Sequence, residues 1–491
     1  MASSNPAKPA THAPRNIILC FDGTGNKFGE NSNVVRFFHS LIKDDHDRQL
    51  VYYQPGIGTY NKRQFITRSA SWLASVFDQG VALHIDDHVK EGYQYVMRNY
   101  RKGDKISLFG FSRGGKNSLI PLEFWLVGIL PAHNDQQLDF AFNVYRTTGN
   151  EGYDLSKEFK QTFAMPVTIE FVGVWDTVSS VGIIPRSHPY TSVNYAVKHF
   201  RHALALDERR ARFRPNVWNE ATLEREQELD VDEPVIDFPG HKISRDEWMY
   251  SPPDRDVCDV QEVWFSGCHA DVGGGSHTNQ IHESLSYIPL RWMIKECLLA
   301  GTGILFDFQY LESLGIDLLK LSKELENKNF DLAALGFHPD VLVDESKGLS
   351  DTSAGPEKSN AILIPHRNQQ HILKPSHLSR ALHRFATHAD ILAKVFDQLD
   401  LKWAWWCLEV IPTLATYQKA DGNWVRKRMR NFGQGRYIPF HNDEIKVHVS
   451  VKIRQKDKGY TPAAYNWKDV IESDMLIWVG DEKEERKEMG V

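Results

Sequence analysis

Residues 105–114 read KISLFGFSRG, and this stretch decides the fold that the rest of the chain has to satisfy. Its first half is a short apolar run typical of a buried strand, and residues 116–128 carry apolar side chains at near-helical spacing. Between them lies GFSRG (residues 110–114), a Gly-x-Ser-x-Gly pattern. A strand, this pattern and a helix in that order are typical of a nucleophile elbow, where a sharp turn exposes the serine hydroxyl above a parallel sheet. The stretch therefore predicts a serine hydrolase.

Further apolar runs alternate with helical patterns along the chain. The runs that predict buried strands are 15–21, 50–53, 166–175 and 260–265, and apolar spacing predicts helices over 33–41 and 81–96. Near-continuous apolar strands are typical of a sheet that helices cover on both faces. We therefore expect an α/β fold, with an α/β-hydrolase-like, mostly parallel sheet and helices on both faces.

Two stretches interrupt this alternation and set the expected domain organisation. Residues 207–256 are highly charged and predict a surface insertion in a catalytic core of residues 15–300. Residues 301–440 predict a helical lid or subdomain. The Ala/Pro/Ser-rich residues 1–14 predict a disordered tail, and residues 441–491 a return strand (446–453) with a C-terminal tail.

Composition narrows the class of protein. The 491 residues are 41% hydrophobic and 25% charged, with a formal net charge of −6, which gives no reason to expect nucleic-acid binding. No apolar run is long enough for a membrane span, and the N-terminus lacks the apolar core of a signal peptide. Five scattered cysteines suit free thiols in a reducing compartment. The expected location is therefore the cytoplasm.

A serine hydroxyl becomes a nucleophile when a histidine base, held by a carboxylate, takes its proton. In α/β-hydrolases the three residues follow in the order Ser, acid, His, at the carboxyl ends of strands. Asp176 ends the strand of 166–175, and His269 follows the strand of 260–265. The order and spacing predict a catalytic triad of Ser112, Asp176 and His269, which requires neither a cofactor nor a metal.

Other assignments stay open at this stage. Asp271 follows His269 closely and is an alternative acid, with His448 on the last predicted strand as its base. Otherwise Asp271 caps or stiffens the glycine loop and His448 is structural. Each residue also has a structural interpretation when it is considered alone. Asp176 could be a helix N-cap or turn residue, and His269 could be a buried histidine that bonds to the backbone.

The oxyanion hole is expected at the loops beside the serine. The backbone N–H of Arg113 follows the nucleophile, and Gly23 or Thr24 in the loop after the first strand is the expected second donor. Asp22 beside them either orients this loop through hydrogen bonds or contacts substrate.

These residues belong to four ordered motifs: FDGTGN (21–26), GFSRGG (110–115), VGVWDTV (172–178) and GCHADVGGG (267–275). In this order they resemble the uncharacterised α/β-hydrolase family related to bacterial type VI secretion phospholipase effectors. The resemblance covers roughly residues 15–300, and it implies a triad of Ser112, Asp176 and His269. The activity that it implies is ester hydrolysis, with phospholipid acyl chains as the substrate class. An inactive hydrolase-fold binding or scaffold protein is the alternative.

One further stretch suggests a contact with lipid. Residues 401–414 (LKWAWWCLEVIPTL) contain Trp403, Trp405 and Trp406, and four cations follow: Arg426, Lys427, Arg428 and Arg430. An apolar aromatic patch beside a basic cluster is what peripheral binding to an anionic bilayer requires. The alternative is a helix buried on the core, with a solvated basic turn.

Overall fold

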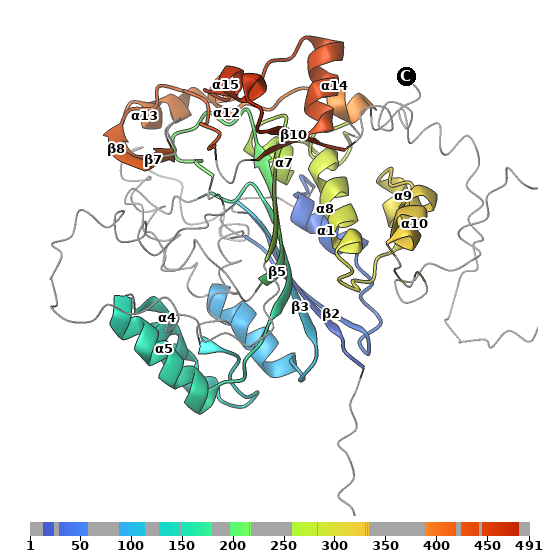
Figure 1. The fold of residues 1–491 in the computed structure, drawn as a ribbon, viewed down its shortest axis with the longest axis vertical. Coiled ribbons are helices and arrows are strands. Elements are labelled where there is room, and N and C mark those ends of the chain that lie inside the picture. The colour runs from blue at the N-terminus through green and yellow to red at the C-terminus, as the bar shows by residue number, and fades with distance from the viewer. Residues whose placement is uncertain are drawn as a thin grey trace, which may run out of the picture.

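The structure, a computed structural model, describes most of the chain outside several long segments (Figure 1). The described residues are 13–23, 29–56, 88–112, 127–147, 149–178, 197–215, 217, 258–281, 283–328, 330, 332, 388–418, 424–440 and 444–480. The predicted tail of residues 1–14 therefore falls almost wholly outside the described residues, as does the predicted helix after Ser112.

A sheet of eight strands forms the centre of the described part of the chain, in the order β10-β9-β6-β5-β4-β3-β1-β2. The strands are β1 Asn16–Phe21, β2 Gln49–Gln54, β3 Lys105–Phe111, β4 Ile169–Trp175, β5 Val197–Ala205, β6 Asp259–Phe265, β9 Ile445–His448 and β10 Leu476–Val479. Every neighbouring pair in this sheet is parallel. The predicted α/β fold and its parallel sheet are confirmed.

The strand order changes direction at β1. The chain adds β2 on one side of β1 and then continues with β3 on the other side, so β1 lies between them. In open α/β sheets ligands bind in the crevice that such a reversal leaves beyond the carboxyl ends of the strands. Asp22 and Gly23 follow β1 at this point, and Ser112 follows β3.

Helices cover both faces of the sheet, because successive side chains of a buried strand point to opposite sides. Ile18 of β1 faces a core formed with α1 (Asn33–Ser40) and α8 (Tyr287–Leu299). Its neighbour Ile17 faces a second core, which includes apolar side chains of helical residues 88–99 and of α4 (Leu138–Arg146). Figure 1 shows α1 and α8 on one side of the sheet, with α4 and α5 (Gly149–Phe163) on the other. The predicted helix 33–41 corresponds to α1.

Strand β5 has no counterpart among the predicted strands. Its sequence, VKHFRHALA, alternates charged and apolar residues and does not read as a continuous apolar run. Its basic side chains pair across the sheet: exposed Lys198 with Glu170 at 2.8 Å and buried Arg201 with Asp259 at 2.6 Å. Cross-strand ion pairs therefore help to hold β5 in the sheet, and its sequence lacks the continuous apolar run that predicts a buried strand.

The late strand is shorter than its predicted range of 446–453. Strand β9 ends at His448, and α14 (Val449–Lys458) begins there because the His448 side chain accepts the N–H of Ser450 as a helix cap. Helix α15 (Trp467–Glu472) and β10 then follow, and β10 extends the sheet beyond β9.

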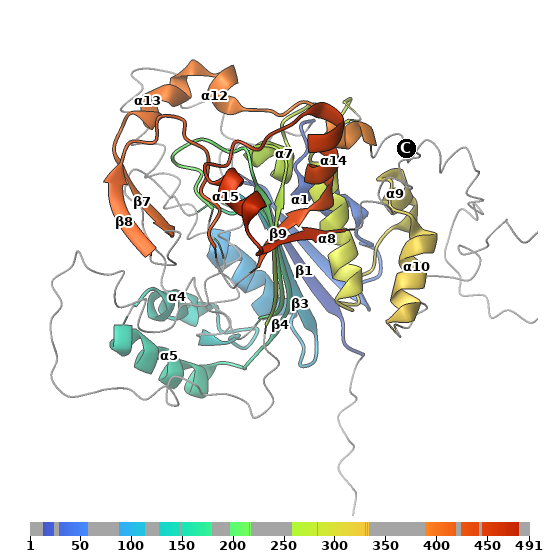
Figure 2. The same cartoon turned by 45° about the horizontal axis from the view of Figure 1, so that its top comes forward.

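The region 301–440 contains helices, as expected, and also a β-hairpin. Its described helices are α9 Phe308–Ser313, α10 Leu318–Asn327, α12 Gln398–Leu401 and α13 Trp406–Glu409, with a 3₁₀ turn, η5, at Trp403–Trp405. The hairpin is β7 Thr413–Gln418 with β8 Trp424–Met429, paired antiparallel. Figures 1 and 2 show the hairpin grouped with α12 and α13. Among the described residues, no helix combines the length and the apolar character that a bilayer crossing requires.

The aromatic centre of the core gives a test of the fold. Phe37 on α1 is fully buried, with its ring 4.0 Å from that of Phe109 and 5.7 Å from that of Phe306. We expect Phe37→Ala to lower the free energy of unfolding by about 3–5 kcal/mol, because the cavity cannot collapse around rigid rings. Urea unfolding at pH 7 measures the loss. Phe140→Ala, at a helical site that is 51% exposed, is the control and should cost about 1 kcal/mol or less. Equal losses would contradict this description of the core.

Candidate active site

Ser112 lies at the turn that ends β3. Its φ of 59° is in the left-handed region, which a residue other than glycine adopts only where the surrounding structure enforces it. Its N–H donates to the carbonyl of Trp175 on the adjacent strand β4 at 3.1 Å, which extends the sheet pairing into the turn. This is the backbone conformation expected of a nucleophile elbow.

Asp176 is the first residue after β4, and it also has a left-handed backbone, with φ 43°. Its N–H donates to the carbonyl of Ala203 at 2.7 Å, and its Oδ1 accepts the N–H of Ala205 at 2.9 Å. The carboxylate is fully buried. Asp176 thus lies beside Ser112 at the same edge of the sheet. Its hydrogen bonds to β5, the strand on the side away from Ser112, hold it there.

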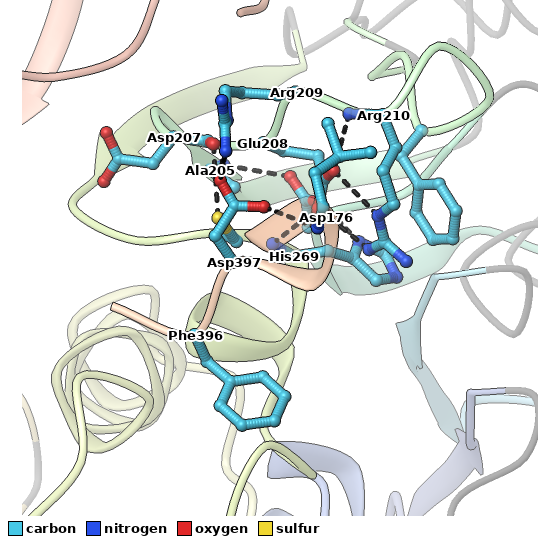
Figure 3. A network of polar contacts seen from close by, with 12 residues as sticks. Asp176, Ala205, Asp207, Glu208, Arg209, Arg210, His269, Phe396 and Asp397 are labelled. Atoms are coloured by element: carbon cyan, nitrogen blue, oxygen red, sulfur yellow. Dashed lines mark hydrogen bonds and ion pairs between the residues drawn. The ribbon is translucent and has the colours of Figure 1, made fainter. Parts of the chain in front are cut away.

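His269 begins α7 (His269–Gly273), after the loop that follows β6. Its Nδ1 lies 2.5 Å from Oδ2 of Asp176 (Figure 3). The imidazole packs against Phe111, the residue before Ser112, at 4.7 Å between ring centroids, and against Phe213 at 4.9 Å. The structure therefore brings the predicted acid and base together next to the elbow.

The electrostatics of this pair suit a general base. Burial lowers the pKa of His269, and the contact with the Asp176 carboxylate offsets only part of this effect. The imidazole is therefore neutral at pH 7, with its Nδ1–H donated to Asp176 and Nε2 left as a proton acceptor. Burial alone would raise the pKa of Asp176, but the guanidinium of Arg436 and the hydrogen bond from His269 hold it well below its usual range.

A second buried carboxylate braces the histidine from the other side. Glu208, which follows β5, accepts the backbone N–H of His269 at 3.2 Å and binds Arg210 through two hydrogen bonds of 2.9 Å (Figure 3). Burial would raise the pKa of Glu208, but the charge of Arg210 outweighs it and lowers the pKa to about 2. The guanidinium also lies 3.4 Å from the centre of the Phe213 ring, and so fixes the ring beside His269.

Residues 207–211 thus belong to the site, although the sequence assigns them to the beginning of a surface insertion. Asp207, Glu208 and Arg210 are buried, and Glu208 and Arg210 form an ion pair. Asp207 accepts the N–H of Gly267 at 2.6 Å and the hydroxyl of Tyr460 at 2.6 Å. Glu208 pairs with its neighbour Arg210, but the other partners of Asp207 and Glu208 are distant in sequence, so the charged composition alone suggests solvent exposure. The rest of the predicted insertion, beyond residue 217, lies outside the described residues.

Asp271 and His448, the alternative acid and base, each lie at the beginning of a helix. Oδ2 of Asp271 accepts the N–H of Cys268 at 2.9 Å and that of Phe396 at 2.8 Å, and burial raises its pKa to about 7. Nδ1 of His448 lies 2.8 Å from Oγ of Ser450, and burial lowers the pKa of His448 to about 3. These contacts describe helix caps, whereas Asp176 meets His269 directly.

The glycines that follow His269 allow close packing behind the site. A Cβ at Gly273 would approach the Phe111 ring to 1.8 Å, so only glycine lets α7 lie directly on the end of β3. Gly274 pairs with Ser32, the N-cap of α1. The GGG motif therefore fixes the histidine loop against the elbow strand.

Only part of the predicted oxyanion hole falls in the described residues. Gly23 is buried, and its N–H donates to Oδ1 of Asp22 at 2.7 Å, while Tyr53 donates its hydroxyl to Oδ2 at 2.9 Å. These bonds match the expectation that Asp22 orients the loop. Thr24 and Arg113 lie outside the described residues.

Of the predicted lipid-contact residues whose side chains the structure describes, all but Trp405 are exposed. Trp403 is 80% exposed and Trp406 40%, whereas Trp405 is half-buried with its ring 5.7 Å from that of Phe213. Arg428 and Arg430 are exposed, and the side chains of Arg426 and Lys427 lie outside the described residues. Sequence reasoning missed Phe432, which is 62% exposed and has a φ of 50°.

The mostly parallel sheet with helices on both faces is that of an α/β-hydrolase-like protein. Residues 15–296 match the family model described as the type VI secretion system phospholipase effector Tle1-like catalytic domain, and the chain belongs to this family. The resemblance carried by the four sequence motifs is thereby confirmed.

Three individual proteins that resemble this chain share at most 26% sequence identity with it. The chain is 26% identical, over 581 aligned positions, to the uncharacterized protein YEL023C of Saccharomyces cerevisiae, covering 92% of this chain and 81% of that protein. A crystal structure of an uncharacterized protein from Pseudomonas aeruginosa is similar at 18% identity and a TM-score of 0.33, over 63% of this chain and 48% of that one. The Tle1 effector bound to the VgrG spike of the type 6 secretion system is similar at 17% identity and a TM-score of 0.29, over 54% and 52%. The chain thus spans about half the length of each solved chain.

The ion pair of Glu208 predicts a pH-dependent contribution to stability. Its pKa falls from 4.5 to about 2 in the folded protein, so its contribution is complete above pH 4.5 and is lost as pH falls through about 2. We expect Glu208→Gln to lower the free energy of unfolding at pH 7 by about 3 kcal/mol, and by progressively less below pH 4.5. Urea unfolding between pH 7 and pH 3 measures the difference. Parallel pH profiles for the two proteins would rule out the assigned pairing with Arg210.

Proposed function

We propose that the protein is a serine esterase that cleaves the acyl ester bonds of phospholipids through an acyl-enzyme on Ser112. The observation that carries the proposal is the buried 2.5 Å contact between Asp176 and His269 beside a serine in a left-handed turn. Membership of a phospholipase effector family supports a lipid ester as substrate. Alcohol, carboxylate and neutral imidazole supply the groups that acyl transfer requires.

The proposed reaction has two steps. Nε2 of His269 takes the hydroxyl proton of Ser112 as Oγ attacks the ester carbonyl, and the imidazolium then protonates the leaving alkoxide. Water attacks the resulting acyl-enzyme with the same histidine as base, and this releases the fatty acid and restores the serine. Asp176 keeps the proton on Nδ1 and stabilises the imidazolium.

The tetrahedral intermediate needs hydrogen-bond donors for its oxyanion. We assign this role to the N–H of Arg113 together with Gly23 or Thr24. The loop after β1 and the elbow after β3 lie on adjacent strands where the strand order reverses, which supports a donor from this loop. The N–H of Gly23 is donated to Oδ1 of Asp22, so Gly23 can serve only if that bond is released.

An inactive binding or scaffold protein is the second candidate function, because a fold does not by itself imply activity. The strained φ angles of both Ser112 and Asp176 favour the enzyme. Strain of this kind costs stability and persists where function requires it.

Active-site labelling tests the proposal. We expect a fluorophosphonate probe to label Ser112, and Ser112→Ala to lose both the label and the turnover of p-nitrophenyl esters by at least about a thousandfold. Mass spectrometry of the labelled peptide identifies the modified residue.

Ser107→Ala is the matched control. Ser107 lies on the same strand and is fully buried, so its loss should leave labelling and turnover unchanged. Labelling at a different serine, or ester turnover that survives in Ser112→Ala, contradicts the proposed nucleophile. A folded wild-type protein that neither labels nor turns over ester points to the scaffold function.

We also propose that the protein docks on anionic bilayers through an aromatic patch beside the site. The patch consists of the exposed residues Leu401, Trp403, Trp406, Val410, Ile411 and Phe432. Phe432 donates its N–H to the carbonyl of Glu409, and Trp406 lies over Gly433, so the two segments adjoin. Exposed Arg428 and Arg430 supply positive charge toward anionic headgroups.

The patch is attached to the catalytic loops. Asp397, the N-cap of α12, pairs with Arg209 at 2.6 Å, and the N–H of Phe396 donates to Asp271 on the histidine helix. Trp405 contacts Phe213, which contacts His269. Docking through this patch would therefore bring the bilayer to the catalytic histidine.

Vesicle sedimentation tests the docking. We expect Trp403→Ser and Phe432→Ser each to weaken binding to phosphatidylcholine vesicles containing phosphatidylserine by about tenfold, because each removes an inserted aromatic. Arg428→Glu with Arg430→Glu should weaken binding only when phosphatidylserine is present. Phe140→Ser, at an exposed phenylalanine on α4, is the control and should bind as the wild type does. Binding that none of the patch variants weakens would exclude this surface.

A further inference from the structure

Arg436 contacts the proposed catalytic carboxylate from a part of the chain far beyond the family match, which ends at residue 296. Its Nη1 donates to Oδ1 of Asp176 at 2.6 Å and its Nη2 to Oδ2 at 2.9 Å. Both side chains are buried, at 6% and 0% exposure. A paired, bidentate arginine is the strongest partner that a buried carboxylate can have in a protein.

The remaining donors of the guanidinium are directed at the same site. Nη1 also donates to the carbonyl of Ala205 at 3.1 Å, and Nε donates to the carbonyl of Phe213 at 2.9 Å. Phe213 is the residue whose ring packs on His269. Arg436 therefore fixes both the carboxylate and an aromatic wall of the imidazole.

The backbone around Arg436 is itself fixed. A Cβ at Gly435 would approach the carbonyl oxygen of Ala463 to 1.8 Å, so glycine is required for this close contact. The carbonyl of Arg436 accepts the N–H of Tyr465 at 2.8 Å. Two residues further on, the N–H and carbonyl of Ile438 both bond the side-chain amide of Asn466 at 2.8 Å. The C-terminal segment thus holds the arginine in one position.

We propose that Arg436 is a positioning residue of the active site, which orients Asp176 and keeps His269 a neutral base through its positive charge. The proposal rests on the function proposed above for Ser112, Asp176 and His269. It assigns to the C-terminal region a contribution to catalysis that the family domain alone does not contain.

The charges around the imidazole, and their signs, explain why Arg436 influences the pKa of His269. Asp176 and Glu208 favour the imidazolium, and Arg210 opposes it. The guanidinium of Arg436 bonds the Asp176 carboxylate directly, so its positive charge weakens the attraction of that carboxylate for the imidazolium. Burial also disfavours the charged form of His269. Removing the charge of Arg436 leaves Asp176 free to stabilise the imidazolium more strongly, so the pKa of His269 must rise.

Arg436→Gln is the decisive variant, because the amide keeps one hydrogen bond to Asp176 but removes the charge. We expect the pKa of His269 to rise by about one to two units, as a unit charge a few ångströms away requires. The acidic limb of the kcat/KM profile should move to higher pH by the same amount, so activity below the limb falls at least about tenfold. KM for a p-nitrophenyl ester should change little compared with kcat.

Histidine NMR titration separates this proposal from the function on which it rests. ¹³C-labelled histidine reports the protonation of His269, assigned with His269→Gln, whether or not the protein hydrolyses esters. A shifted NMR titration without ester turnover supports the role of Arg436 and contradicts the esterase. Ester turnover that requires Ser112, with the same His269 pKa in wild type and Arg436→Gln, overturns the role of Arg436 alone.

Arg15→Gln controls for the loss of a buried ion pair. Arg15 is 7% exposed and binds Asp104 through Nε at 3.4 Å and Nη2 at 2.7 Å, near the amino end of β3. It should destabilise the protein without moving the titration of His269, and an equal shift in both variants would overturn the proposal. Arg436→Lys keeps the charge without the planar fork, so it should restore the wild-type pKa of His269 with kcat lowered about tenfold. If Arg436→Gln does not fold, an Arg436→Lys protein with wild-type kcat contradicts the positioning role.

Discussion

The hydrogen bond between Asp176 and His269 is the interaction on which the rest of the site depends. It places a negative charge where there is no solvent, and an ionised carboxylate is buried in a protein only when other groups compensate it. Here the N–H of Ala205 and the guanidinium of Arg436 supply that compensation. The donors that stabilise this buried charge come from two distant parts of the chain, β5 and the C-terminal region.

The parallel sheet explains how residues so distant in sequence meet. All of its neighbouring strands run in the same direction, so the residues that follow β1, β3, β4, β5 and β6 emerge at one edge. The strand order reverses beside β1, next to the turn that carries Ser112, and this is the position where open α/β sheets bind ligands. The left-handed turns at Ser112 and Asp176 then aim two side chains of adjacent strands out of the sheet. Backbone strain at these two positions is the local cost of this arrangement.

Sequence patterns could predict this much of the site because each predicted residue lies at a strand end with a strong apolar signal. Ser112 and Asp176 follow continuous buried runs, and His269 begins α7 shortly after β6, whose last three residues are buried. Glu208, Arg210 and Arg436 carried no comparable signal. Charged residues near each other in sequence suggest a solvated surface, and only the topology places the Glu208–Arg210 pair against His269 and Arg436 against Asp176. Strand β5 was missed for the same reason, since its lysine and arginine pair across the sheet.

The end of the family match is therefore not the end of the polar network around Asp176 and His269. Beyond residue 296 the chain supplies Arg436 to Asp176, Tyr460 to Asp207 and the backbone of Phe396 to Asp271. Strands β9 and β10 also complete one side of the sheet, and Ile453 of α14 lies in the same core as β3 and α8. Removing this region would expose the apolar edge of β6 and leave three buried carboxylates each without one of its donors. A buried carboxylate that loses a donor is destabilised by more than an exposed one. The sheet of this chain consequently continues into its C-terminal region, which also supplies a hydrogen-bond donor to each of these carboxylates.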